Sequence, residues 1–167
     1  MDEHLLRFKK DTNYVLIDCE TENLCLHSMN NLPWQIGMIK AKGENKVDEQ
    51  DLWLSWDREI DVSEGAAKVT HFNFKNYKKR AKDAKKLFPI MRDWLDNADY
   101  IIGHNILGFD IYLLKDYYNY MGLDYKHLLP KIIDTNCIAK GIKYGFKFNP
   151  RESFISYQYK VLHTYKK

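Results

Sequence analysis

Two acidic residues separated by a single position, Asp18 and Glu20, directly follow the apolar run 14–17. In extended backbone, residues i and i+2 point to the same face of a sheet. Carboxylates brought together in this way repel, and a proton, a basic neighbour or a divalent metal relieves the repulsion. Mg²⁺ and Mn²⁺ prefer such oxygen ligands. The pair therefore indicates either an ordinary solvated strand end or two ligands of a metal site.

A third acid, Asp110, ends the segment 103–110, which follows the apolar run 100–102. In α/β proteins, functional side chains collect where strands end beside the ligand crevice. Asp110 also lies where a helix is expected to begin, and the helix dipole favours a carboxylate there without any chemistry. Asp134 follows the short expected strand 131–133 and is a further candidate of the same kind.

Hydrophobic periodicity predicts the elements that must hold these acids. Short β-rich or alternating runs predict strands, and apolar residues repeating every three to four positions predict helices. The expected strands are 14–17, 34–39, 51–56, 99–103 and 131–133, and the expected helices are 87–95, 110–121 and 135–143. This order predicts an α/β fold with a mixed sheet of about five strands, the first three antiparallel, flanked by helices.

The composition indicates one globular domain spanning 1–167. Hydrophobic residues make up 45% and charged residues 29%, which argues against disorder. No apolar run approaches the roughly 20 residues that cross a bilayer. The 3 cysteines form no C-x-x-C pair, which argues against a disulfide framework or a cysteine-based zinc site. Since the N-terminus also lacks a signal-peptide pattern, a cytoplasmic protein is expected.

Basic residues are concentrated in two stretches. Residues 75–86 hold seven Lys or Arg and one acid, Asp83; residues 135–167 hold seven and one acid, Glu152. Such stretches attract polyanions or form solvated faces, and the sequence leaves both readings open. Aromatic residues also occur in the segment 144–167, for which we expect a basic aromatic tail without regular periodicity.

Four motifs together resemble the DnaQ-like (DEDD) 3′–5′ exonuclease superfamily. They are Asp18-Cys19-Glu20-Thr21, Trp34-Gln35-Ile36-Gly37, Gly103-His104-Asn105 through Phe109-Asp110, and Ile133-Asp134-Thr135. The resemblance spans about residues 12–143, and order, spacing and placement at strand ends agree at once. It implies an RNase H-like fold and a hydrolase of phage or bacterial type.

The resemblance also implies roles for individual residues. Asp18, Glu20 and Asp110 would be catalytic and would hold two Mg²⁺ or Mn²⁺ ions, with Asp134 as the candidate further ligand. Thr21, Asn105 and Phe109 would contact the strand near its 3′ end. The implied substrate is single-stranded DNA or a free 3′ end, RNA remains open, and the implied protein partner is a DNA polymerase or replication protein.

The sequence departs from the family late in the chain. The common (DEDDh) branch has a late helix carrying a His, four residues and an Asp, but no Asp follows Asp134 here. Only Glu152 and His163 remain as late candidates. Three alternatives stay open: a truncated chain lacking its last helix; a short variant using Asp134, Glu152 or a residue from a partner; and a non-catalytic nucleic-acid-binding or polymerase-associated module.

Overall fold

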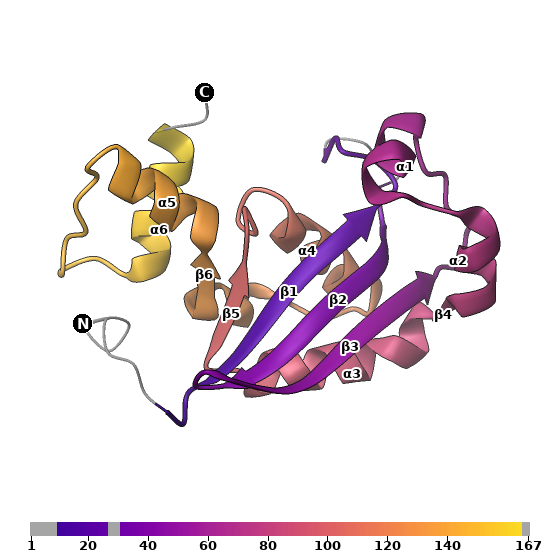
Figure 1. Cartoon of the computed structure of the whole chain (residues 1–167), viewed down its shortest axis with the longest axis horizontal. Coiled ribbons are helices and arrows are strands. Elements are labelled where there is room, and N and C mark those ends of the chain that lie inside the picture. Colours follow the sequence, from indigo (N-terminus) through magenta and orange to yellow (C-terminus); the bar gives the residue numbers. More distant parts are fainter. Residues whose placement is uncertain (1–9, 27–30, 165–167) are drawn as a thin grey trace.

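Six strands form one mixed sheet in the computed structural model, which describes residues 10–26 and 31–164 (Figure 1). They are β1 (Asn13–Thr21), β2 (Pro33–Lys42), β3 (Asn45–Ser55), β4 (Lys82–Asp83), β5 (Tyr100–Gly103) and β6 (Ile132–Asp134), in the spatial order β4-β3-β2-β1-β5-β6. The first three strands are antiparallel, whereas β5 runs parallel to β1 and β6 parallel to β5. The predicted α/β fold class is confirmed, and β4 is an additional short strand.

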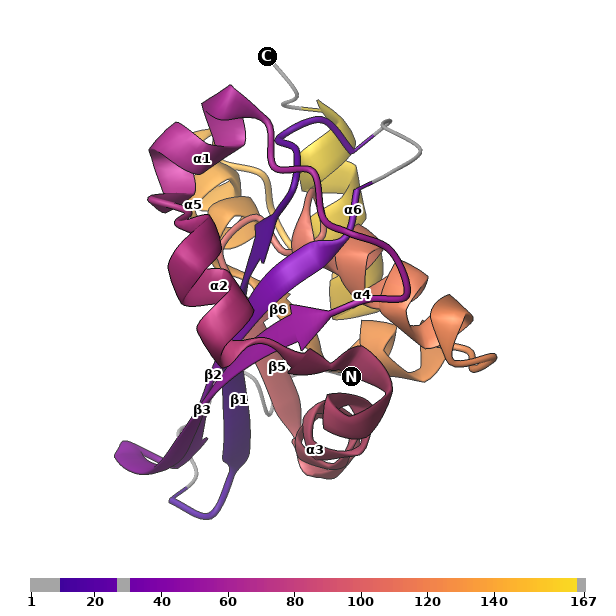
Figure 2. The same cartoon turned by 90° about the vertical axis from the view of Figure 1, so that its right-hand side faces the viewer.

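The helices follow the strands in two groups. Two short helices, α1 (Glu64–Thr70) and α2 (Phe74–Arg80), were not predicted; they lie together beside the ends of β1–β3 (Figures 1 and 2). The others are α3 (Ala84–Asn97), α4 (Asp110–Tyr120), α5 (Thr135–Lys143) and α6 (Phe154–Thr164), with a 3₁₀ turn, η2 (Lys126–Lys131), after α4. None of the helices in the described ranges is long and apolar enough to span a membrane.

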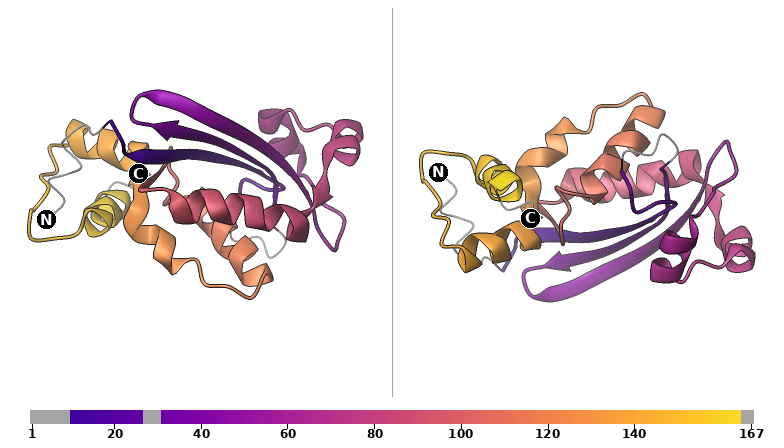
Figure 3. Two further views of the ribbon diagram at one scale, coloured as in Figure 1. Left: turned by 90° about the horizontal axis from the view of Figure 1, so that it is seen from below. Right: turned by 90° about the horizontal axis from the view of Figure 1, so that it is seen from above.

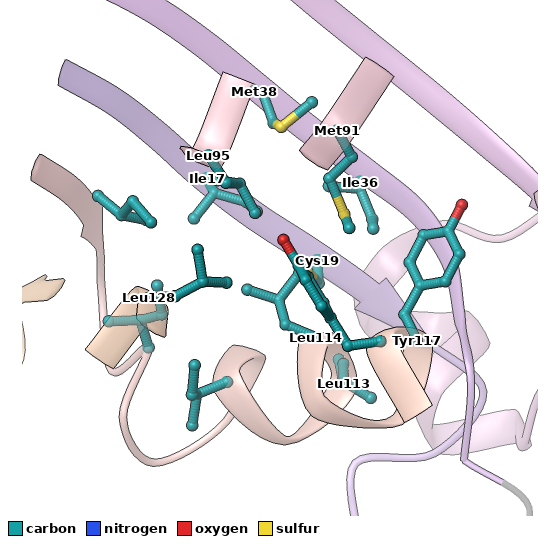
Figure 4. Packing of buried hydrophobic residues seen from close by; sticks show 14 of the residues in the cluster. Ile17, Cys19, Ile36, Met38, Met91, Leu95, Leu113, Leu114, Tyr117 and Leu128 are labelled. Atoms are coloured by element: carbon teal, nitrogen blue, oxygen red, sulfur yellow. The ribbon is translucent and has the colours of Figure 1, made fainter. Parts of the chain in front are cut away.

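One face of the sheet is covered by α3 and α4 and forms the core (Figure 4). Alternation along β1 directs Val15, Ile17 and Cys19 to this side, each at most 5% exposed. From the helices, Met91 and Leu114 meet them and are equally buried. The same alternation must direct the residues between them, Asp18 and Glu20 included, to the opposite face.

The described helices leave that opposite face of β1–β3 open (Figure 3). Leu16 and Ile39 are 39% and 38% exposed there. A hollow of about 490 Å³ lies over the face and is lined by residues of all three strands, among them Asp18 and Gly37. Asp18, the first acid of the predicted pair, therefore borders open space.

The prediction of an aperiodic tail at 144–167 is wrong for residues 154–164. These residues form α6, which packs beside α5 at the β6 edge of the sheet. Its buried residues include a polar one, Gln158, which receives a hydrogen bond from the Asp134 N–H (2.6 Å) and donates one to the Ile132 carbonyl (2.9 Å). A side-chain amide thus occupies the free edge of β6. Residues 165–167 of the predicted tail lie outside the described residues.

Candidate active site

The end of β1 presents two carboxylates on the open face. Asp18 is exposed and Glu20 is half-buried. In the antiparallel partner β2, Gly37 lies opposite Asp18, and Gln35 lies opposite Glu20. Because Gly37 has no side chain, it leaves the space beside Asp18 open. The strand register therefore places Asp18 where a ligand can approach it.

Asp110 comes to this strand end from α4, where it is the first residue of the helix. Its side chain is 2% exposed, and its Oδ1 accepts a hydrogen bond from the backbone N–H of Cys19 at 2.9 Å. That N–H belongs to the residue between Asp18 and Glu20. The hydrogen bond holds the Asp110 carboxylate at the backbone of the acidic pair.

The three acids influence one another electrostatically. Burial, and secondarily the charge of Asp18, raises the pKa of Asp110 to about 6, although the hydrogen bond from the Cys19 N–H opposes the rise. Burial and then the same Asp18 charge also raise the pKa of Glu20. Asp18 therefore acts on both other carboxyls. A cation among them would relieve this repulsion.

The donor chemistry of this trio fits a hard divalent cation, since all three groups offer carboxylate oxygens. The geometry is looser than that of a formed metal site. Within the described residues, no three His, Cys, Asp or Glu side chains are gathered in an arrangement that could hold a metal ion. The fit is thus one of charge and donor type, and ligation would require the carboxylates to converge.

Asp134, the candidate further ligand, is fully buried at the N-terminus of α5. Its Oδ1 accepts hydrogen bonds from the backbone N–H groups of Asn105 (3.0 Å), Asn136 (2.9 Å) and Cys137 (3.2 Å). Its Oδ2 accepts one from Leu107 at 3.0 Å. Both oxygens are already engaged, so in this conformation Asp134 holds the 103–109 turn and caps a helix.

The turn 103–109 is shaped by local backbone requirements. Asn105 adopts a left-handed conformation with φ 60°, which asparagine tolerates better than most residues. A side chain at Gly108 would meet the Asn105 Oδ1 at 2.5 Å and would have to displace this amide. The Asn105 Oδ1 accepts from the Asn136 Nδ2 at 3.2 Å, and the exposed His104 ring lies 3.0 Å from the Thr135 hydroxyl.

The three residues predicted to contact a nucleic-acid strand differ in how exposed they are. Asn105 and Phe109 are half-buried and lie in the turn that leads to Asp110. Thr21 is only 1% exposed, and its hydroxyl donates to the Asn31 side chain and, at 3.2 Å, lies near the Leu32 carbonyl. The Thr21 side chain therefore holds the segment before β2, and Asn105 and Phe109 are better placed to reach a ligand.

Sequence reasoning missed Glu22, which is fully buried two residues beyond Glu20. Its carboxylate receives two hydrogen bonds from the Arg58 guanidinium (2.6 and 2.7 Å) and one each from the Leu32 and Asp61 N–H groups (both 2.8 Å). It fixes the chain directly after the candidate ligands. Its only sequence signal is a third acid at alternate spacing, which does not distinguish a buried ion pair from an exposed carboxylate.

The late candidates Glu152 and His163 have partners near α6. Glu152 forms an ion pair with Lys160, and the His163 ring stacks on Tyr159 at a centroid distance of 6.0 Å. Both side chains therefore make their contacts with residues of α6.

Solved structures with a similar fold include those of exonuclease I. No protein-family model matches the chain, and no curated protein sequence matches it. The zinc-bound E. coli ExoI–ssDNA complex is similar with a TM-score of 0.69 and 13% identity over 80% of this chain and 30% of that chain. Exonuclease I in complex with the inhibitor BCBP is similar with a TM-score of 0.71 and 11% identity, over 95% of this chain and 42% of that chain. The ExoI/SSB-Ct complex is similar with a TM-score of 0.69 and 11% identity, over 92% of this chain and 41% of that chain.

These likenesses establish the fold. The chain has the RNase H-like architecture of the exonuclease I structures but spans less than half of their length. At this identity, the roles of individual residues must be argued from the site itself.

Proposed function

We propose that this chain is a metal-dependent 3′–5′ exonuclease domain that hydrolyses phosphodiester bonds at the ends of single-stranded DNA. The observation that supports it most is the position of Asp110, whose carboxylate is bound to the backbone between Asp18 and Glu20. A buried acid with a raised pKa beside two further acids is a costly arrangement unless a cation compensates it. The exonuclease fold, seen elsewhere with single-stranded DNA and a zinc ion, supports the same reading.

The residues would divide the work by their placement. Bound divalent ions would supply a hydroxide for attack on phosphorus and would neutralise the leaving 3′ oxygen. Asp18, which is exposed and acts on both other acids, would be one ligand of these ions. Asp110 is held in place by the Cys19 N–H and must lose its proton to serve as a ligand. Asn105 and Phe109 would position the terminal nucleotide.

A non-catalytic nucleic-acid-binding module is the second candidate. It is favoured by the engagement of both Asp134 oxygens in backbone hydrogen bonds, which leaves the trio without a fourth acid in this conformation. This reading predicts binding that does not depend on divalent metal and that survives loss of the acids.

The deciding experiment follows a 5′-labelled single-stranded oligonucleotide on a gel with Mn²⁺ or Mg²⁺, with and without EDTA. We expect stepwise shortening from the 3′ end that EDTA stops and that Asp18→Ala and Asp110→Asn abolish. The exposed Glu44→Gln variant is the control and should cut normally. Cleavage that persists in an Asp18→Ala/Glu20→Ala double variant would overturn the proposal. An RNA oligonucleotide of the same sequence tests the sugar preference.

A further inference from the structure

The short helix α2 displays a basic surface with an aromatic ring in it. Its sequence contains no acid, and four of its exposed residues, Phe74, Lys75, Lys78 and Lys79, are called the α2 surface below. The neighbouring Arg80 is different, because its guanidinium pairs with Asp51 at 2.6 Å and lies over the Trp53 ring. The charge of Arg80 is therefore offset by Asp51, and Arg80 is not counted in the α2 surface.

Phe74 is held in a defined position although it is 46% exposed. Its ring lies nearly parallel to that of Tyr77, with an interplanar angle of 26°. Tyr77 is in turn fixed by a 2.7 Å hydrogen bond from its hydroxyl to the Leu54 carbonyl. On Phe74 lies the Lys78 ammonium, 4.6 Å from the ring centroid. A nucleobase that stacks on this ring would displace the exposed Lys78 ammonium from the ring face, and the displaced ammonium could then contact the phosphate of the same nucleotide.

A hollow of about 290 Å³ lies beside the α2 surface, between α2 and the segment that follows β3. Its lining includes Phe74, Lys78 and Arg58. Arg58 is the residue that pairs with Glu22, two positions beyond Glu20. Two acids, Asp57 and Glu59, also border the hollow, and Asp57 is offset by Lys85 at 3.0 Å. Figure 1 shows α1 beside the end of β1 and α2 beyond the end of β3.

We propose that the α2 surface binds a single-stranded nucleic acid, with a base stacked on Phe74 and phosphates at Lys75, Lys78 and Lys79. This inference rests on the proposed function and adds to it the path of the strand upstream of the end being cut. Stacking and phosphate contacts do not read sequence, so the surface binds strands of any sequence. The competing reading is a solvated basic face that makes no contact.

Binding is measured without catalysis, by fluorescence anisotropy of a labelled oligothymidylate in EDTA across a salt series. We expect Lys75→Ala/Lys78→Ala to raise the Kd about tenfold and to reduce the salt slope by roughly 1.4, since each phosphate contact on a single strand contributes about 0.7. The matched control, Lys115→Ala/Lys126→Ala, removes two lysines exposed elsewhere and should bind like the wild type. Equal weakening by both doubles, or by neither, would overturn the proposal.

Phe74 is tested by its chemistry. Phe74→Ala should weaken binding about tenfold, because a base–aromatic stack is worth about 1–3 kcal/mol. Phe74→Trp keeps a stacking ring and should restore wild-type affinity, whereas Phe74→Leu keeps only the apolar contact and should not. Restoration by Leu would reject the stacking role.

A single-nucleotide substrate separates this inference from the proposed function. The p-nitrophenyl ester of thymidine 5′-phosphate is too small to span the site and the α2 surface. The lysine double variant should therefore hydrolyse this ester with unchanged kcat/KM but cut the oligonucleotide with a KM raised about tenfold. If the wild type cuts neither substrate while the anisotropy differences remain, the hydrolytic function fails and the binding surface stands.

Discussion

At the scale of single residues, the ionised form of Asp110 that would bind a metal also lowers the stability of the metal-free fold. Its pKa is 3.8 in the ordinary reference state and about 6 in the folded protein, mainly because of burial. The folded state therefore holds this proton more tightly than the unfolded chain does. Without a cation, the stability of the fold falls as pH rises from about 4 to above 6, and the full penalty is present at neutral pH.

Asp110→Asn should therefore stabilise the metal-free protein at pH 7.5, by up to about 3 kcal/mol, and hardly at pH 3.5. Asparagine keeps the Oδ1 that accepts from Cys19 but carries no charge. Urea unfolding in EDTA at both pH values measures the difference. Exposed Glu44→Gln should show no comparable pH-dependent gain; an equal gain for Asp110→Asn at both pH values would contradict the role of ionisation.

At the scale of elements, the Glu22–Arg58 pair joins three segments: the end of β1, the start of β2 and the loop before α1. Because Glu22 is fully buried, removing its partner leaves an uncompensated charge. Arg58→Ala should cost about 3 kcal/mol of unfolding free energy by urea titration. Arg92→Ala, which breaks the exposed pair with Asp96, should cost about 0.5 kcal/mol or less. Similar losses for both variants would show that burial of the pair is unimportant.

A second prediction about stability concerns Gln158, which lies at the β6 edge of the sheet. Gln158→Leu fills similar space but leaves the Asp134 N–H and the Ile132 carbonyl unpaired. We expect a loss of about 3 kcal/mol, since each buried unpaired group costs about 1–3 kcal/mol. Hydrogen exchange at the Asp134 amide should accelerate by at least tenfold. Unchanged protection of that amide would show that α6 does not close the edge of β6.

The elements also show what local pattern can reveal. The core strands and α3–α5 were predicted because alternation and helical periodicity mark one buried face. The first half of β3 was missed, since residues 45–49 are all exposed and so lack any alternation. The helices α1 and α2 are too short for periodicity, and the buried face of α6 contains polar Gln158. Which acids are saturated, like Asp134, and which are open, like Asp18, depends on contacts between distant segments.

At the scale of the whole molecule, charges of opposite sign are separated around the open face. Acids lie at its centre, with Asp18 and Glu20 on β1 and, paired with Arg80, Asp51 on β3. The basic stretch 75–86 lies at one side and the stretch containing α5 and α6 at the other (Figure 1). A polyanionic strand drawn to the flanks would be repelled by the central acids. A cation at the centre would relieve this repulsion and let one strand contact both regions.

That argument gives a prediction for the intact chain that needs no catalysis. A divalent ion that binds only the folded protein stabilises it by about 2.7 kcal/mol at one hundred times its Kd. Mn²⁺ at pH 7.5 should therefore raise the Tm by roughly 5 °C or more for a chain of this size. At pH 5 the shift should shrink, because Asp110, with a pKa of about 6, is then mostly protonated.

The variants assign the ligands in the same melting experiment. Asp18→Asn should abolish the Mn²⁺ shift at pH 7.5, and Glu44→Gln should retain it. Asp134→Asn should lower the Tm, because it weakens the acceptor of four backbone N–H groups, but it should keep the Mn²⁺ shift if Asp134 holds the turn and binds no metal. Loss of the Mn²⁺ shift in Asp134→Asn would indicate that Asp134 is the fourth ligand. A shift retained in Asp18→Asn would show that the metal does not bind at the open face.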